Sequence, residues 1–252
     1  MKKYQWIDNL MSLEVLLQTE KKTTSDTLNL RDEDSIEINN LINIFFRLSY
    51  KCREDVQLDS EKHWFISIAT SIYIRLPYNI RAIYILWLKG YYLEAIIVFR
   101  QILEGLPTLR YFHKYPEKIK KHIEGTKRVP FSTIFNEFSP DFYKNWYGKT
   151  FSALAHGGLI ANLLRFKRSL SLHETIMGCE FNSENSNLVT VPTILISYGY
   201  LTFTCIFFPS INSKLNSMMK NRIKDISEHI ESKYLKKSDN DFLKVVLPII
   251  CK

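Results

Sequence analysis

The segment from residue 78 to residue 106 restricts the fold more than any other part of the chain. Its two apolar stretches, YNIRAIYILWLK and YYLEAIIVFRQILEGL, are separated by Gly90, which stands where a helix typically ends. Pro77 precedes the first stretch, and proline is favoured in the first turn of a helix. This pattern predicts a helical hairpin, which we expect to form the centre of the fold.

Composition extends the helical prediction to the whole chain. The 252 residues include only 8 Gly and 8 Pro, which are too few turn residues for a β-sandwich or a barrel. A hydrophobic content of 46% is enough to bury one large core. We therefore expect an all-α fold, a single multi-helix bundle spanning residues 1–252, with its main motifs between residues 78 and 158.

Apolar spacing and cap residues place further helices before the hairpin. A first helix is expected from Tyr4 to about Thr19, followed by a flexible polar loop from Glu20 to Asp34. Ser35 is expected to cap a second helix, and Ser60 a third helix that ends before Pro77.

Prolines and glycines divide the chain after the hairpin begins. Pro107 is expected to kink or break the second hairpin helix, and Pro116 to begin the basic helix EKIKKHIE. The sequence Ser139-Pro140-Asp141 predicts the cap and first turn of a helix that runs to His156. The glycine pair at 157 and 158 then supplies the helix stop.

The last third of the chain holds its least regular and its most apolar segments. Residues 165–187 predict a loop or a short strand pair, and two final helices are expected at about 191–208 and 213–236.

Residues 188–209 are nearly uncharged and approach the length of about 20 residues that spans a bilayer. Four Thr, one Ser, one Gly and an internal Pro favour a buried central helix over the alternative of membrane association, so stable membrane insertion is not expected.

Charge and cysteine content limit the partners and the compartment. The 34 Lys and Arg residues exceed the 26 Asp and Glu residues and give a net charge of +8, which favours anionic partners without singling out nucleic acid. The four cysteines show no C-x-x-C spacing and no evident pairing with histidines, so neither a metal nor another cofactor is expected. These features, and an N-terminus without the apolar stretch of a secretory signal, predict a cytoplasmic protein.

Arg100 and Glu104 are the first pair that could carry chemistry. They lie four residues apart in FRQILEG, so they share one face of a helix and are able to pair. The preceding EAIIVF is strongly apolar, so at least one of the two is expected inside the fold, where an unpaired charge costs several kcal/mol. The pair is either an internal salt bridge or an arginine aimed at a phosphate and held by its glutamate.

A second set of polar residues lies in YGKTFSALAHGG. Ser152 and His156 are four residues apart, and Tyr147 is close enough along the helix for one face to present a hydroxyl, an imidazole and a phenol. The helix C-terminus favours the protonated ring of His156, and the glycines after it leave room for a ligand. The alternative is a histidine that only bonds to a neighbouring helix. No G-x-S-x-G elbow supports a Ser–His hydrolase.

Arg110 and His113 in RYFHKYP form a third candidate. Their basic and aromatic surroundings suit RNA binding, so both are candidate substrate-binding residues. Aromatic helix ends of this kind also serve packing, which is the alternative. The histidines elsewhere in the chain show no spacing typical of a metal site.

Two of these motifs resemble a large group of prokaryotic all-helical proteins. In that group a Gly-x-x-x-Glu-Ala stretch leads into an Arg-x-x-x-Glu helix, and a Tyr…Ser-x-x-x-His-Gly helix follows, as between residues 82 and 158 here. These proteins are in turn similar to HEPN-type helical domains, many of which are RNases or RNA-binding components of toxin–antitoxin and anti-phage systems. The resemblance implies an intracellular helical effector of a bacterial toxin or anti-phage defence system, and a homodimer with its site at the seam.

The chain departs from the usual HEPN nuclease signature, in which a His follows an Arg by five or six positions in one helix. The spacing from Arg110 to His113 is too short for this signature, and the spacing from Arg165 to His173 is too long. If the chain is a nuclease, an arginine and a histidine must therefore converge from different helices.

Metal-independent RNA cleavage needs an acid, a base and a cation near the phosphorus atom. On this hypothesis His156 is the acid or the base, Arg100 is the cation and Glu104 orients Arg100. Ser152 or Tyr147 then positions the phosphate. The alternative function is a non-catalytic helical module that binds a protein or nucleic-acid partner, with the same polar residues in a buried network.

Overall fold

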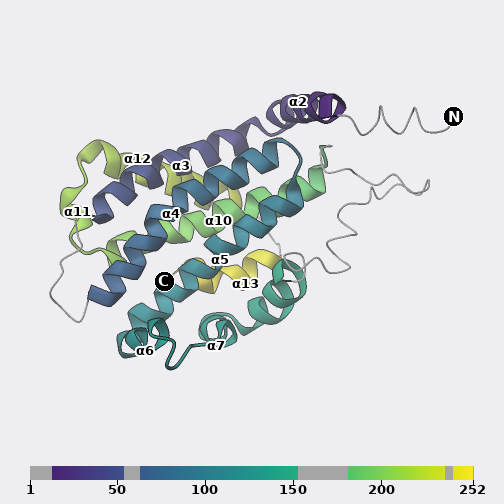
Figure 1. Cartoon of the computed structure of the whole chain (residues 1–252). Helices are drawn as coiled ribbons and strands as arrows, with labels where there is room; N and C mark the ends of the chain where they lie inside the picture. Colours follow the sequence, from purple (N-terminus) through teal and green to yellow (C-terminus); the bar gives the residue numbers. More distant parts are fainter. Residues whose placement is uncertain (1–12, 54–62, 153–180, 236–240, 252) are drawn as a thin grey trace.

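The computed structural model describes residues 13–53, 63–152, 181–235 and 241–251. In these ranges the chain is helical apart from short connections, and no strand is present (Figure 1). The prediction of an all-α bundle is therefore confirmed.

The central hairpin consists of α4 (His63–Leu88) and α5 (Tyr92–Lys114), which pack along each other. Gly90 has a φ of 78°, which glycine adopts without strain, and its N–H donates to the carbonyl of Trp87 over 3.0 Å. The N–H of Tyr91 donates to the carbonyl of Leu86 over 2.8 Å. The predicted hairpin and its turn are thus confirmed.

Neither proline of the hairpin ends its helix, so the helix end expected before Pro77 and the break expected at Pro107 are wrong, while the alternative of a kink at Pro107 stays a prediction. Helix α4 runs through Pro77, and α5 runs through Pro107. Each proline is buried, with buried apolar neighbours such as Leu76 and Leu106. An interior proline costs about 3 kcal/mol, while each fully buried leucine or isoleucine contributes about 1.5–3 kcal/mol. Core packing on both sides of the proline therefore outweighs the lost backbone hydrogen bond.

Helix α10 (Ser183–Phe207) is the central helix, in contact with both arms of the hairpin (Figure 1). It is long and apolar enough to cross a membrane, but most of its residues are buried inside the fold. It begins earlier than expected because the Asn182 side chain accepts a hydrogen bond from the N–H of Asn185 over 2.9 Å. Residues 183–187 are therefore helical, and residues 165–180 lie outside the described ranges.

Close approach between helices requires glycine at two positions. A Cβ atom added to Gly105 in α5 would lie 2.3 Å from the hydroxyl of Tyr200 in α10. A Cβ added to Gly199 would lie 2.6 Å from Cδ2 of Leu106. Both distances are shorter than real contacts, so a larger residue at either position would push α5 and α10 apart.

The predicted polar loop at residues 20–34 is wrong, because α2 (Leu13–Leu30) and α3 (Asp32–Arg53) occupy it. Glu20 fixes α2 to the hairpin turn by accepting hydrogen bonds from Lys89 Nζ and the Tyr91 hydroxyl, each over 2.7 Å. Tertiary contacts therefore stabilise a helix whose own polar sequence indicated a loop. The expected helix start at residue 4 lies outside the described ranges.

Short helices after α5 form one end of the molecule (Figure 1). The 3₁₀ turn η1 (Pro116–Lys118) leads into α6 (Ile119–Ile123), which confirms the helix expected from Pro116. Helix α7 (Phe131–Asn136) follows, and then η2 (Phe142–Ser152), which has π-type hydrogen bonding. The Ser139 hydroxyl accepts a hydrogen bond from the N–H of Phe142 over 3.3 Å, as expected of a cap.

The C-terminal region contains more helices than the sequence predicted. The single helix expected at 213–236 is divided into α11 (Ile211–Lys214), α12 (Ser217–Ile230) and η3 (Glu231–Leu235). The division follows from Asn216, whose side chain caps α12 by accepting from the N–H of Met219 over 2.9 Å. Helix α13 (Asp241–Ile250) was not predicted and packs against α10, α5 and η2.

Candidate functional site

The structure brings together three of the predicted site residues, which we call the Arg100 triad: Arg100, Glu104 and Tyr147. Arg100 Nε donates to Glu104 Oε1 over 2.5 Å, and the Tyr147 hydroxyl donates to the same oxygen over 2.5 Å. Arg100 Nη2 donates to the Tyr147 hydroxyl over 3.1 Å. The two motifs that the sequence singled out separately therefore meet at one carboxylate oxygen.

Aromatic packing holds Tyr147 over α5. The ring of Phe135 in α7 lies 4.7 Å from the Tyr147 ring, measured between centroids. Trp146 packs edge-on against Phe242 of α13 at 4.8 Å, and Phe151 contacts Phe99 of α5 at 5.2 Å. These contacts fix the middle and the C-terminal end of η2, so the position of the Tyr147 hydroxyl is set by the core rather than by the triad alone.

The triad is partly open to solvent. The side chains of Arg100 and Glu104 are 24% and 19% exposed, while Tyr147 is buried. Burial and the neighbouring Glu104 raise the pKa of Tyr147 well above its ordinary value. Burial lowers the pKa of Arg100, but the hydrogen bond and charge of Glu104 outweigh it, so the net direction is upward. Arg100 stays charged and Tyr147 stays neutral near pH 7, so neither of these two residues supplies acid–base chemistry there.

His156 is the residue that the sequence offers for this role, and it lies outside the described ranges. The backbone of Ser152 ends η2, and nothing is described of its side chain. Phe151, just before the end of η2, lies against Phe99, the neighbour of Arg100 in α5. The convergence of His156 with Arg100 stays a prediction.

The contacts of Arg110 favour the alternative in which this residue serves packing rather than RNA binding. Its Nη1 donates to the carbonyls of Pro248 and Ile249 over 2.5 and 2.7 Å, at the C-terminal end of α13. Its guanidinium lies 4.4 Å from the ring centroids of both Phe138 and Phe203. Burial lowers the pKa of Arg110 to about 10, which still leaves it charged at neutral pH. Arg110 therefore binds the last carbonyls of a helix, where cations are favoured.

His113 also lies against core residues. Its ring centroid is 5.4 Å from that of Phe65 and 5.8 Å from that of Phe207. Burial lowers the pKa of His113, so its neutral form is favoured. The substrate-binding role of Arg110 and His113 stays a prediction, because their described contacts are made with other parts of the fold. Among the described residues, no group of His, Cys, Asp or Glu is arranged to hold a metal ion.

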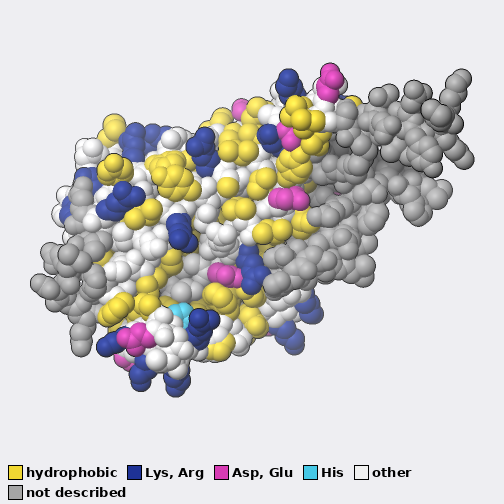
Figure 2. Space-filling model, in the orientation of Figure 1, with side chains coloured by type: hydrophobic (Ala, Val, Ile, Leu, Met, Phe, Trp, Pro, Cys, Tyr) yellow, Lys and Arg dark blue, Asp and Glu magenta, His cyan; other side chains and the backbone are white. Residues whose placement is uncertain are grey.

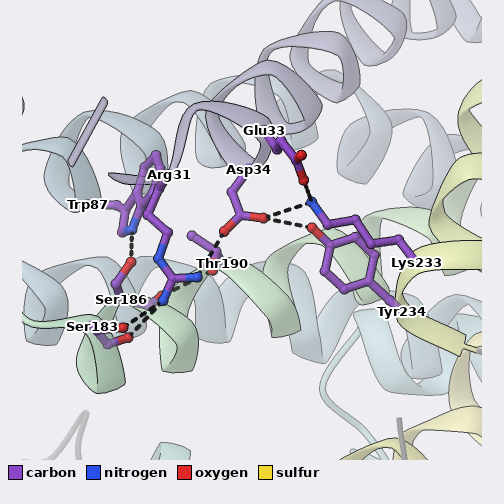
Figure 3. A network of polar contacts seen from close by, with 9 residues as sticks. All are labelled: Arg31, Glu33, Asp34, Trp87, Ser183, Ser186, Thr190, Lys233 and Tyr234. Carbon is purple, nitrogen blue, oxygen red and sulfur yellow. Dashed lines mark hydrogen bonds and ion pairs between the residues drawn. The ribbon is translucent and has the colours of Figure 1, made fainter. Parts of the chain in front are cut away.

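Sequence reasoning missed a second polar network, which we call the Asp34 cluster: Arg31, Asp34, Lys233 and Tyr234 (Figure 3). The Tyr234 hydroxyl donates to Asp34 Oδ1 over 2.8 Å, and Lys233 Nζ lies 3.4 Å from the same oxygen. Arg31 Nη1 lies 3.7 Å from Asp34 Oδ2, and Nη2 donates to Ser183 Oγ over 2.8 Å. The three acidic residues of RDED could have indicated this part of the cluster from the sequence, because acidic residues are favoured in the first turn of a helix.

Glu37 lies one helical turn beyond Asp34 and is almost fully buried, at 5% exposure. Its Oε2 is 3.5 Å from His229 Nε2, and its Oε1 is buried and has no hydrogen-bond partner among the described residues. Burial raises the pKa of Glu37, although the charges of His229 and Lys233 oppose this effect. The Asp34 cluster and the contact between Glu37 and His229 together join α3 to α12 and η3.

Comparison with protein families, with curated proteins and with solved structures finds no match to this chain. The similarity to HEPN-type domains accordingly stays a prediction from the two motifs. The geometry of the described residues is the basis for the function that follows.

Proposed function

We propose that this protein is a helical effector that acts on RNA, with Arg100 as the cation of its site. The observation that carries the proposal is the Arg100 triad. It holds a partly exposed arginine on the rigid hairpin, beside the helix that leads toward His156. An arginine held by a carboxylate has a fixed orientation and presents planar donors suited to phosphate. The basic net charge of +8 favours an anionic partner of this kind.

The proposed reaction is cleavage by the ribose 2′-hydroxyl. A base takes the proton of this hydroxyl, its oxygen attacks phosphorus, and the bond from phosphorus to the 5′-oxygen breaks as an acid protonates that oxygen. His156 acts as the acid or the base, and Arg100 stabilises the negative charge on the phosphorane. Glu104 acts on Arg100 as a positioning residue, while Ser152 or Tyr147 positions phosphate.

The test is cleavage of total RNA and of tRNA by the full chain in the presence of EDTA. His156→Ala and Arg100→Ala are expected to abolish cleavage while the protein stays folded by circular dichroism. Arg81→Ala is the matched control, because Arg81 is an exposed arginine on α4, and it should cleave at the wild-type rate. Cleavage that persists in His156→Ala, or no cleavage by the wild type, would contradict the proposal.

A second candidate function is a non-catalytic module for a protein or nucleic-acid partner. It is favoured by the closed form of the triad, in which Glu104 accepts from both partners and the Tyr147 hydroxyl both donates and accepts. Such networks also serve structure alone, because buried polar groups need hydrogen-bond partners. On this interpretation no RNA is cleaved, and Arg100→Ala lowers the unfolding temperature.

The homodimer that the resemblance implies is tested separately, by light scattering of the purified chain.

A further inference from the structure

Positive charge is concentrated just beyond the end of α5. Residues 114–128 hold six Lys and Arg against two Glu, a net charge of +4 in fifteen residues, compared with +8 for the whole chain. Figure 2 shows Lys and Arg side chains gathered along the lower edge of the molecule, over α6. We call this region the basic surface, with the residues Lys118, Lys120, Lys121, Lys127 and Arg128.

Two lysines of the basic surface are brought together by local backbone structure. Gly125 has a φ of 72° and ends α6, which turns the chain back on itself. The N–H of Lys127 then donates to the carbonyl of Lys121 over 3.0 Å, so the two residues are neighbours although six positions apart. The N–H of Val129 donates to His122 Nδ1 over 2.9 Å and fixes the returning chain. Lys121 and Lys127 are both exposed.

Aromatic rings lie directly beside these cations. Lys118 Nζ is 3.8 Å from the ring centroid of Tyr115 and donates to the Tyr111 hydroxyl over 2.9 Å. The two tyrosine rings are 4.8 Å apart. The Tyr115 ring is half-buried, and Phe131 at the start of α7 is 41% exposed. The surface therefore offers ring faces as well as positive charge.

The start of the basic surface lies on the same side of α5 as the Arg100 triad. At about 100° per residue, Arg100, Glu104, Tyr111 and Tyr115 fall within a sector of about 60°. The rise of about 1.5 Å per residue puts Tyr115 about 16 Å along the helix axis from Glu104. A chain of a few nucleotides covers such a distance, but Pro107 and Tyr111 on the intervening turns are buried, so a strand that reaches both places has to pass beside this face.

We infer that the basic surface binds single-stranded RNA and leads it toward the Arg100 triad. This inference rests on the proposed action on RNA and names where the strand is held. Cations beside ring faces bind single strands through phosphate contacts and base stacking. A lipid surface fits less well, because it favours a long amphipathic helix, whereas these cations lie on a 3₁₀ turn, a five-residue helix and a loop.

The test measures binding alone, so that its failure differs from a failure of the proposed cleavage. The probe is a fluorescent 2′-O-methyl oligouridylate, which resists cleavage, and its anisotropy is followed from low to high salt in EDTA. Lys121→Gln with Lys127→Gln removes two charges from the basic surface. Each lost phosphate contact is expected to reduce the slope of log K against log salt by about 0.7, and the pair to weaken binding about tenfold at 0.1 M salt.

The matched control is Lys21→Gln with Lys22→Gln, which removes two exposed charges from α2. This control is expected to retain wild-type affinity and slope. A third variant, Phe131→Ala, tests stacking and is expected to weaken binding with no change of slope. The inference is overturned if both double variants bind alike, or if wild type does not bind the probe, including the case in which it binds vesicles containing phosphatidylserine instead.

Discussion

Glu104 and Asp34 are bonded in nearly the same way in two distant regions of the molecule. Each carboxylate accepts a hydrogen bond from a tyrosine hydroxyl, Tyr147 for Glu104 and Tyr234 for Asp34. Each also has a cation beside the same oxygen, Arg100 at 2.5 Å and Lys233 at 3.4 Å. The hydrogen-bonding pattern alone therefore does not distinguish a functional site from a network that only stabilises the fold.

What differs is the setting of the two carboxylates. The Asp34 side chain is 9% exposed, and through Arg31, Lys233 and Tyr234 its cluster joins α3, η3 and the start of α10. The Glu104 side chain is 19% exposed and joins α5 to η2 alone through Tyr147. Of the two carboxylates, Glu104 lies in α5, the helix that leads into the basic surface. We therefore expect the Asp34 cluster to stabilise the fold, and the Arg100 triad to affect function more than stability.

The largest effect is expected from Asp34→Ala. Removing a buried carboxylate leaves Lys233 and the Tyr234 hydroxyl without a shared partner, which should cost about 3 kcal/mol. Urea unfolding measures this loss. Glu33→Ala is the control, because Glu33 is exposed and bonds to the same lysine at 2.9 Å. It should leave the midpoint unchanged, and equal losses in both variants would remove the distinction between buried and exposed carboxylates.

Glu104→Gln should have a smaller effect on stability and a larger one on function. The amide oxygen still accepts hydrogen bonds, but the charge that holds Arg100 is lost, so about 1–2 kcal/mol is expected. RNA cleavage should fall much more than this stability loss explains, while binding at the basic surface is kept. If Glu104→Gln loses as much stability as Asp34→Ala and RNA cleavage is unchanged, the triad, like the Asp34 cluster, serves to stabilise the fold.

Tyr147→Phe and Tyr234→Phe form a matched pair. Each change removes one hydroxyl that donates to a carboxylate, so each should cost about 1 kcal/mol in unfolding free energy. The melting temperatures of the two variants are expected to agree closely. RNA cleavage should fall in Tyr147→Phe only, and a fall in both variants would show that the Asp34 cluster also matters for activity.

The smallest effect is a pH dependence at Glu37. A carboxyl whose pKa is raised by burial holds its proton more tightly in the folded chain than in the unfolded chain, where its pKa is near 4.5. Its stabilising contribution is complete below the unfolded pKa and is lost as the pH rises through the folded pKa. Glu37→Gln should therefore be more stable than wild type at pH 7, and this advantage should disappear on acidification. Unfolding at several pH values, with Glu33→Gln as control, measures it.

Local signals in the sequence predicted several elements correctly, and each of them depends on short-range chemistry. Gly90 ends α4, Pro116 begins the basic helical turn, and the Ser139 hydroxyl caps η2 as expected. The four-residue spacing of Arg100 and Glu104 also predicted their ion pair. The sequence placed Tyr147 among the site residues but did not show that its hydroxyl meets Glu104.

Long-range contacts account for what the sequence did not predict. Helix α2 depends on Glu20, whose partners are 69 and 71 positions away. Helix α13 contains Pro248, and its last carbonyls are bonded by Arg110, a contact that no spacing rule indicates. Pro77 remains helical only because the core surrounds it. In each case tertiary packing overrides the preference of the local sequence.

The contact between Trp146 and Phe242 gives the protein an optical reporter beside its candidate site. Trp146 directly precedes Tyr147, and indole emission moves to longer wavelength when the ring meets water. Trp87 is fully buried, with its Nε1 bonded to Ser186 over 2.8 Å, so its emission should stay constant while the fold is intact. In a chain whose other two tryptophans, Trp6 and Trp64, are replaced by phenylalanine, a red shift on adding RNA without loss of helical ellipticity would therefore show η2 separating from α13.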